Sequence, residues 1–191
     1  IEMPSRGIDG VVVAVSLTTI KIRSWNNTLQ TIPPYLLISE PFDNWQAMRD
    51  SGGRRIKRNI NIDMSSLRFA DEAFIESLRT NEATAEIMKS IATSLEEGGV
   101  VTNLDIYMRY INRYLDTHPR LNHTMTCMVR QLQPTAQGLP LELYFFSDGT
   151  DWVPYEHLQS EIFEHVLKTK MDTRDSKVSM ISISTGKAAS S

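Results

Sequence analysis

The chain has 191 residues and a mass of 21.7 kDa, which is enough for one large domain or two small ones with a buried core. Its 20 basic and 23 acidic residues leave a net charge of −3, so bulk charge does not attract it to DNA or to an anionic membrane. The hydrophobic fraction of 41% is typical of a folded protein. The single cysteine, Cys127, excludes a disulfide within the chain and fits a reducing compartment.

Apolar stretches in the sequence are short. None approaches the ~20 apolar residues that a membrane helix needs, and the longest, residues 11–15, is β-branched and predicts a strand. The N-terminus lacks the basic-then-apolar pattern of a signal peptide. Because the chain begins with Ile1 and not with Met, we expect it to be a fragment of a longer protein.

Residues 1–52 predict a small β domain. Residues 20–23 alternate as a strand, and Asn26-Asn27, which tolerate positive φ, predict a tight hairpin into a third strand over residues 28–32. Pro33 and Pro34 end that strand because they lack backbone donors. The first strand, residues 10–17, alternates with these side chains on one face: Val11, Val13, Val15 and Leu17. Three short strands joined by tight turns predict a small barrel or sandwich.

A domain boundary is predicted at residues 51–53, Ser-Gly-Gly. The charge balance changes beyond it: residues 1–69 carry 9 basic and 6 acidic side chains, and residues 70–191 carry 11 and 17. The pattern also changes, from short strands to alternating helices and strands.

Residues 53–184 predict an α/β domain. A half-buried strand is expected over residues 55–63, followed by helix over 71–97 and a second helix that begins at Thr102, with Asp105 completing a capping box. His118-Pro119 ends this helix. Its buried face is predicted to carry Leu104, Tyr107, Ile111 and Tyr114.

Two strands near residues 125–132 and 141–146 come next, and then a helix capped by Asp151 and a last strand over 178–183. The helix has a predicted buried stripe of Tyr155, Leu158, Ile162 and Val166. The order β-α-β-β-α-β is that of a ferredoxin-like sandwich, here with an enlarged first helical crossover, so the fold class is α+β. Residues 185–191 are predicted to be a flexible tail.

Two residue groups are candidates for chemistry, and neither is well supported. His157, Glu161 and His165 share one helix face and would suit zinc, but a solvent-facing row with a Glu161–His165 pair explains them better. His123 and Cys127 lie four apart on a predicted strand, yet no third group would orient the imidazole. Phosphate-loop and dinucleotide motifs are absent from the sequence. We therefore expect no enzyme activity, metal or cofactor.

The densest basic feature follows Trp45 and consists of Arg54, Arg55, Lys57 and Arg58. Basic side chains near an aromatic ring suit a nucleic-acid backbone and a stacked base. The flanking carboxylates favour a domain junction or subunit interface with paired charges instead: Asp43, Asp50 and Asp63.

Residues 10–33 read GVVVAVSLTTIKIRSWNNTLQTIP. They resemble the signature of the mechanosensitive channel of small conductance (MscS) family, in which a Gly-led strand precedes Leu-Arg-Thr-Thr, Arg-x-Trp-Asp-Gly and Ile-Pro-Asn. The matching residues are Gly10, Leu17, Thr19, Arg23, Trp25, Ile32 and Pro33. Residues 37–45, 51–64 and 129–147 resemble the YbdG-like miniconductance branch more narrowly.

The sequence departs from the family pattern at three points. Thr18 replaces Arg, Asn26-Asn27 replaces Asp-Gly, and Pro34 replaces the final Asn. The hairpin tolerates the second change because Asn also enters the left-handed region. We assign no role to Thr18 or Pro34.

The resemblance implies a particular architecture and function. Family members carry upstream membrane helices, then an Sm-like β domain and an α/β domain that assemble as a homoheptamer around a hollow cytoplasmic vestibule. This chain would be that vestibule portion, at the cytoplasmic side of a bacterial inner membrane. Its channel would open under tension and release ions and small solutes on hypo-osmotic shock. The basic run would lie near the vestibule wall or a subunit contact, and no nucleic acid would be bound. The alternative is a soluble Sm-like RNA-binding ring protein that uses the basic run with Trp25 or Trp45.

Overall fold

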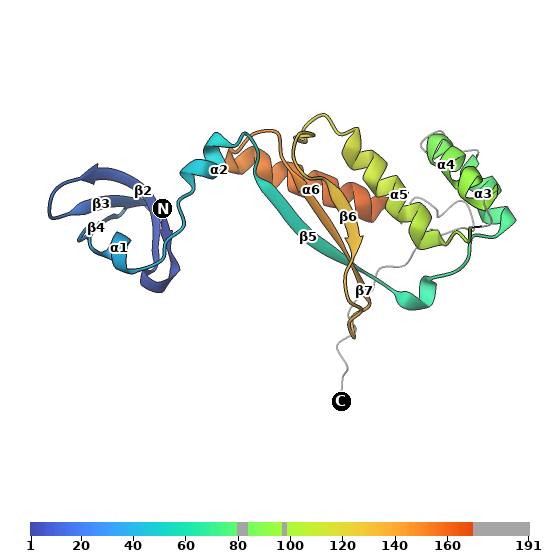
Figure 1. The fold of residues 1–191 in the computed structure, drawn as a ribbon, viewed down its shortest axis with the longest axis horizontal. Coiled ribbons are helices and arrows are strands. Elements are labelled where there is room, and N and C mark those ends of the chain that lie inside the picture. The colour runs from blue at the N-terminus through green and yellow to red at the C-terminus, as the bar shows by residue number, and fades with distance from the viewer. Residues whose placement is uncertain (80–83, 97–98, 170–191) are drawn as a thin grey trace. The chain divides into compact units, whose positions relative to one another are not determined.

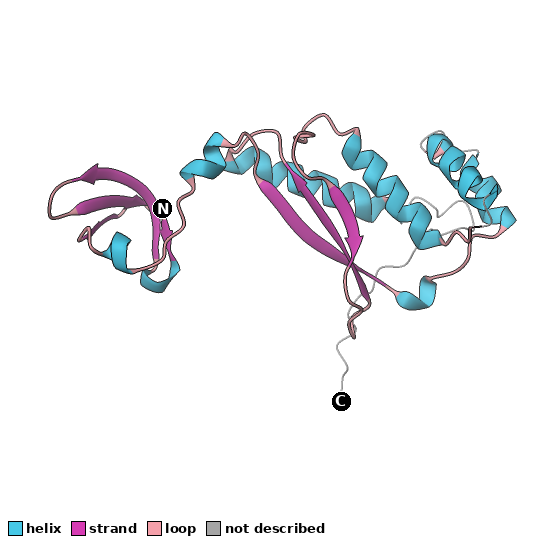
Figure 2. Cartoon of the chain, viewed as in Figure 1, coloured by secondary structure: helices cyan, strands magenta, loops and turns pink. Residues whose placement is uncertain are grey.

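The computed structural model describes residues 1–79, 84–96 and 99–169 and divides into two compact units, Ile1–Gly52 and Gly53–Ser191. Each unit has its own antiparallel sheet and its own hydrophobic core (Figures 1 and 2). The fold is thus mixed α and β.

The sheet of the first unit has the strand order β1-β2-β3-β4. Its strands are β1 (Glu2–Met3), β2 (Ile8–Val15), β3 (Ile20–Ser24) and β4 (Leu29–Ile32). The unit also contains the short helices η1 (Pro4–Arg6), α1 (Leu36–Ser39) and α2 (Gln46–Asp50). Its small core consists of Met3, Ile8, Ile20, Ile22, Ile32 and Leu36.

The β3–β4 hairpin confirms the predicted asparagine turn. Asn27 has φ 66°, the left-handed conformation that asparagine tolerates, and its N–H donates to the Ser24 carbonyl at 2.9 Å. The side-chain oxygen of Asn26 accepts from the Thr28 N–H at 3.0 Å. The turn therefore closes through both backbone and side-chain bonds.

Strand β2 contains a register shift that the sequence pattern did not indicate. Val11 lies opposite Arg23 and Ala14 opposite Lys21, with the irregularity between Val12 and Ala14. Directly opposed residues share a face of an antiparallel sheet, and an extra residue in one strand moves all later side chains to the other face. Val11 and Val15 therefore lie on opposite faces, and the prediction of one continuous face through Val13 to Leu17 is wrong.

The sheet of the second unit has the order β5-β7-β6, with β7 antiparallel to both neighbours. Its strands are β5 (Arg55–Ile62), β6 (Met128–Gln131) and β7 (Leu139–Phe146). Its helices are η2 (Met64–Ser66), α3 (Glu72–Arg79), α4 (Ala85–Glu96), α5 (Asn103–Asp116) and α6 (Trp152–Lys168).

Strands β5 and β6 therefore run in the same direction on either side of β7. This is the split β-α-β arrangement, with α3, α4 and α5 in the connection from β5 to β6. The predicted last strand, residues 178–183, and the tail at 185–191 lie outside the described residues. The ferredoxin-like description of the whole domain accordingly stays a prediction, as does the Sm-like description of the first unit.

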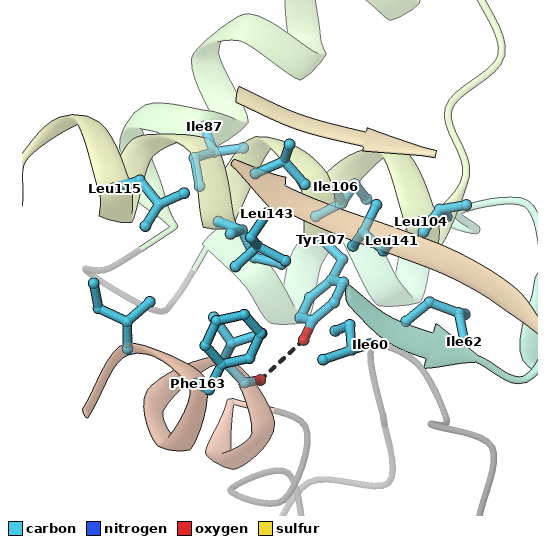
Figure 3. Packing of buried hydrophobic residues seen from close by; sticks show 14 of the residues in the cluster. Ile60, Ile62, Ile87, Leu104, Ile106, Tyr107, Leu115, Leu141, Leu143 and Phe163 are labelled. Atoms are coloured by element: carbon cyan, nitrogen blue, oxygen red, sulfur yellow. Dashed lines mark hydrogen bonds between the residues drawn. The ribbon is translucent and has the colours of Figure 1, made fainter. Parts of the chain in front are cut away.

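The core of the second unit lies between the sheet and helices α5 and α6. Figure 3 shows Ile60 of β5 and Leu143 of β7 packed with Tyr107 and Phe163 from the helices. Six of the eight residues of the predicted helical stripes are buried, and Tyr114 and Tyr155 are half-buried against the core; the buried ones are Leu104, Tyr107, Ile111, Leu158, Ile162 and Val166. The Tyr107 hydroxyl donates to the Val166 carbonyl at 2.9 Å, which ties α5 to the end of α6 (Figure 3).

The two predicted helix caps have different outcomes. Thr102 precedes α5, and its hydroxyl accepts from the Asp105 N–H at 3.2 Å, as predicted. Asp151 occupies the N-cap of α6, but its side chain makes no capping bond. An N-cap side chain accepts from the second or third helical N–H, and here the third residue is Pro154, which has none.

We expect Tyr107→Phe to lower the free energy of unfolding of the second unit by about 1–3 kcal/mol, because it removes the donor from a buried carbonyl contact. Tyr144→Phe, a half-buried tyrosine on the opposite sheet face, is the matched control. Urea unfolding measures both. Equal losses in the two variants would show that the Tyr107–Val166 bond does not stabilise the unit.

Candidate functional site

The first unit exposes many large apolar side chains for its size. We call the following set the apolar arm: Val11, Val13, Val15, Leu17, Trp25 and Leu29. Leu17 is 95% exposed and Val15 is 71% exposed, values unusual for residues next to a regular strand. Exposed apolar side chains gathered on one small sheet favour an interaction surface.

The turn that presents Leu17 is held by hydrogen bonds. The Ser16 N–H donates to the Thr19 carbonyl at 2.8 Å, and the Thr19 N–H donates to the Ser16 hydroxyl at 3.1 Å. The two hydroxyls lie 2.8 Å apart. The motif residue Thr19 therefore stabilises the tip of the β2–β3 hairpin, where Leu17 faces solvent.

Two strand edges of the first unit are available for pairing. In the part of the chain that the structure describes, β4 pairs with β3 alone, and β2 pairs with β1 only at Ile8 and Asp9. The remaining outer edge of β2, residues 11–15, therefore has no strand partner among the described residues. Unpaired edges expose N–H and carbonyl groups to further strands.

Four of the five remaining motif residues have structural explanations, and the fifth, Arg23, is exposed on β3. Gly10 lies opposite Ser24, and a Cβ at this position would be 2.3 Å from the Arg23 carbonyl oxygen, so only glycine fits. The Trp25 indole N–H donates to Asp9 at 2.7 Å. Ile32 is buried at the end of β4, and the carbonyl of Pro33 accepts from the first residue of α1 at 3.2 Å.

The basic run does not form one patch. The guanidinium carbons of Arg54 and Arg58 lie 4.5 Å and 5.1 Å from the ring centroids of Tyr155 and Phe163 on α6. Both arginines thus make cation–π contacts on the helix-covered side of the sheet. Within the chain, these two guanidinium groups therefore contact aromatic rings of α6, and their place at a subunit interface stays a prediction.

Lys57 lies on the opposite face of the sheet, as alternation along β5 requires for residues 55 and 57. Its ammonium is 3.9 Å from a carboxylate oxygen of Glu142 on β7, and Arg130 of β6 donates to the other oxygen at 2.7 Å. Glu142 is only 5% exposed. The sequence analysis did not predict this cluster of charges on three strands. Its signal in the sequence is the single acidic residue, Glu142, among the apolar residues of β7.

The histidine row on α6 is only partly exposed to solvent. His157 is exposed, but His165 is half-buried against Tyr110 and Tyr114 of α5, so its predicted exposure is wrong. Glu161 does not pair with His165. It accepts from Arg120 at 2.9 Å, because the segment after α5 brings that guanidinium over α6. Within the described ranges, no group of three His, Cys, Asp or Glu side chains is placed to hold a metal ion.

His123 and Cys127 do not face one another along a strand. Strand β6 begins only at Met128, and a His123 ring nitrogen lies 3.0 Å from the His118 carbonyl. Burial raises the pKa of the half-buried Cys127 thiol to about 11, with a smaller contribution from Asp116. The thiol therefore stays protonated at neutral pH and is a poor nucleophile.

Comparison with known proteins gives a family match for the first unit and a likeness of fold for nearly the whole chain. Residues 1–47 match the family model described as mechanosensitive ion channel, beta-domain. The whole chain resembles MSL1 of Arabidopsis thaliana, with 12% identity and a TM-score of 0.57 over 94% of this chain. It also resembles MscS of Helicobacter pylori in the closed state, with 15% identity and a TM-score of 0.54 over 97%.

The chain spans about half the length of these structures, 49% of MSL1 and 55% of the H. pylori protein. At these identities the likeness establishes the fold, and the match of residues 1–47 adds support for a relation to the MscS family. None of the helices within the described residues combines the length and apolar character that a bilayer span requires. The YbdG-like branch stays a prediction.

We expect Gly10→Ala to destabilise the first unit by about 1–3 kcal/mol, because the added methyl would overlap the Arg23 carbonyl. Val13→Ala, in the exposed part of the same strand, should change stability by less than about 1 kcal/mol. Thermal unfolding of the two variants measures the difference. If Gly10→Ala unfolds like the parent chain, close packing does not explain this motif glycine.

Proposed function

We propose that the chain is the cytoplasmic vestibule portion of a tension-gated mechanosensitive channel that releases ions and small solutes on hypo-osmotic shock. The observation that carries the proposal is the match of the first unit to the channel beta-domain, combined with the apolar arm and the two available strand edges on that same unit. Membrane helices upstream of Ile1 would supply the pore, and the full protein would reside in a bacterial inner membrane.

Assembly into a ring explains the exposed surface of the first unit. One unit offers the edge of β2 at residues 11–15 and a different edge on β4, so a head-to-tail contact can join β2 of one copy to β4 of the next. Such heterologous contacts close into rings when the rotation permits. Ring closure would remove both edges and cover the apolar arm. The number of seven copies is taken from the family resemblance.

The gating role follows from linkage. An open state that occupies more membrane area is favoured by tension, just as a ligand favours the state that it binds better. The vestibule portion would hold the subunits together below the pore helices and determine which solutes reach them. Arg55 and Lys57, the two members of the basic run on the face opposite the helices, are then the candidates for contact with solutes or with a neighbouring subunit.

The alternative, an RNA-binding ring, receives less support from the side chains. Trp25 and Trp45 donate their indole N–H groups to Asp9 and Glu2, which places a carboxylate beside each ring. A carboxylate at a stacking platform repels a phosphate backbone. Arg54 and Arg58 lie on aromatic rings of α6. Salt-sensitive RNA binding together with a native start near Ile1 would favour this alternative.

We expect Val13→Glu in the full-length protein to abolish ring assembly, because an unpaired carboxylate in a desolvated contact costs about 3–5 kcal/mol. Val153→Glu is the matched control, since Val153 is also exposed but lies on α6. Native mass spectrometry of the detergent-solubilised protein gives the number of copies. Intact rings with Val13→Glu would exclude the apolar arm from the subunit contact.

Patch recording from membranes that carry the full-length protein tests the channel directly. Suction should open conductances, and the double change Arg55→Glu with Lys57→Gln should alter conductance or assembly, because it lowers the positive charge of this sheet face without placing a second carboxylate beside the buried Glu142. Glu164→Lys, a charge reversal at an exposed site on α6, is the control. Currents that do not change with tension in the parent protein would refute the proposed function. Unchanged currents and intact rings in the double variant would refute only the role of the two basic residues.

A further inference from the structure

One tyrosine of α5 lies between two histidines from other parts of the second unit. The rings of Tyr114 and His165 stack at a centroid distance of 3.9 Å and an interplanar angle of 13°. The ring of His118 approaches Tyr114 edge-on at 5.4 Å and 78°. His165 belongs to α6 and His118 to the segment after α5, so this tyrosine joins three pieces of chain.

His165 makes a second contact with α5. Its Nε2 atom lies 2.9 Å from the Tyr110 hydroxyl, and its ring is half-buried. Neutral imidazole has one nitrogen that donates and one that accepts, so it suits a tyrosine hydroxyl in either role. These contacts attach the last third of α6 to α5 close to the Tyr107–Val166 bond.

His118 is held in a form that resists protonation. Its ring is 6% exposed, and its Nδ1 accepts the Arg120 N–H at 3.3 Å. A second proton would have to bind at Nδ1 and would break that bond. The other ring nitrogen lies 3.8 Å from Glu161, whose carboxylate is closer to the Arg120 guanidinium, at 2.9 Å.

The charges around the two rings favour the neutral forms on balance. Burial lowers the pKa of both His118 and His165 below the ordinary 6.5. His118 and Lys168 lower the pKa of His165 further. For His118, Glu161 raises the pKa, while Arg120 and His123 lower it. Among the remaining neighbours, burial raises the pKa of Tyr114.

Acid weakens the packing of these two histidine rings. Exposed histidines bind protons as the pH falls through 6.5, whereas these two, while packed, do so only at lower pH. Between pH 6.5 and the lower pKa values of the packed rings, the form in which α6 has separated from α5 binds more protons than the packed form. Acid therefore shifts the equilibrium toward the separated, open form. The packing contribution is complete above pH 6.5 and decreases as the pH falls below it.

We propose that Tyr110, Tyr114, His118 and His165 form a pH-sensitive clasp that holds the C-terminal part of α6 against α5 at neutral pH and loosens it in mild acid. The clasp is a property of the second unit alone. Its use as a sensor of cytoplasmic acidification rests on the proposed function, so failure of the channel proposal would leave the clasp itself untouched.

Two measurements on the 191-residue chain test the clasp. Proton NMR of the histidine rings should show His118 and His165 titrating at lower pH than the exposed His157. Amide exchange of α6, corrected for the intrinsic effect of pH, should increase from pH 7 to pH 5.5. Because an unpacked histidine has a pKa near 6.5, each of the two can change the opening equilibrium by at most about tenfold at pH 5.5.

Variants separate the clasp from general acid destabilisation. His165→Gln retains a partner for Tyr110 but cannot take up a proton, so it should reduce the pH dependence of α6 exchange, and His118→Asn should do the same. His157→Gln, on the same helix and exposed, should leave that dependence unchanged. A wild-type pH dependence in both clasp variants would overturn the proposal. If a variant fails to fold, the ring titration of the parent chain still decides, because His118 and His165 titrating with or above His157 would also overturn it.

Discussion

The sheet of the first unit has more apolar side chains than its own core can cover. Six residues form that core, whereas the apolar arm has as many members facing solvent in the isolated chain. A domain of about 50 residues buries a smaller share of its surface than a larger one and is correspondingly marginal. Burial of the arm against another copy would therefore stabilise both the unit and the assembly, which couples folding of the β unit to ring formation.

The register shift in β2 determines how that arm is distributed. Without it, Val11, Val13 and Val15 would share one face, and Val12 and Ala14 would share the other. With it, Val11 shares a face with Arg23, while Val15 lies opposite Ile20, on the core side but beyond the core itself. The arm therefore presents apolar side chains on both faces near the hairpin tip. A strand that is apolar on both faces suits insertion between two partners better than contact with one.

Much of the fold was predictable because local signals decide it. The alternation of β5, the buried stripes of α5 and α6 and the Asn26-Asn27 turn follow from periodicity and backbone preference. The errors arise where distant residues decide. The register shift in β2 depends on pairing with β3. The missing cap at Asp151 is the exception, because Pro154 lies only three residues away and the sequence already shows it. The burial of His165 depends on two tyrosines of α5, and no pattern within α6 reveals them.

The same distinction applies to the candidate site. Four basic residues in five positions predict a patch, but a strand sends alternate side chains to opposite faces. Arg54 and Arg58 therefore contact α6, while Lys57 joins Arg130 around Glu142. A buried carboxylate is tolerated only with partners of this kind. Arg54 and Arg58 thus stabilise the packing of α6. The side chains of Arg55 and Lys57 lie on the opposite face of the sheet. In the proposed vestibule, Arg55 and Lys57 would be the candidates for contact with solutes, and Lys57 also compensates the charge of the buried Glu142.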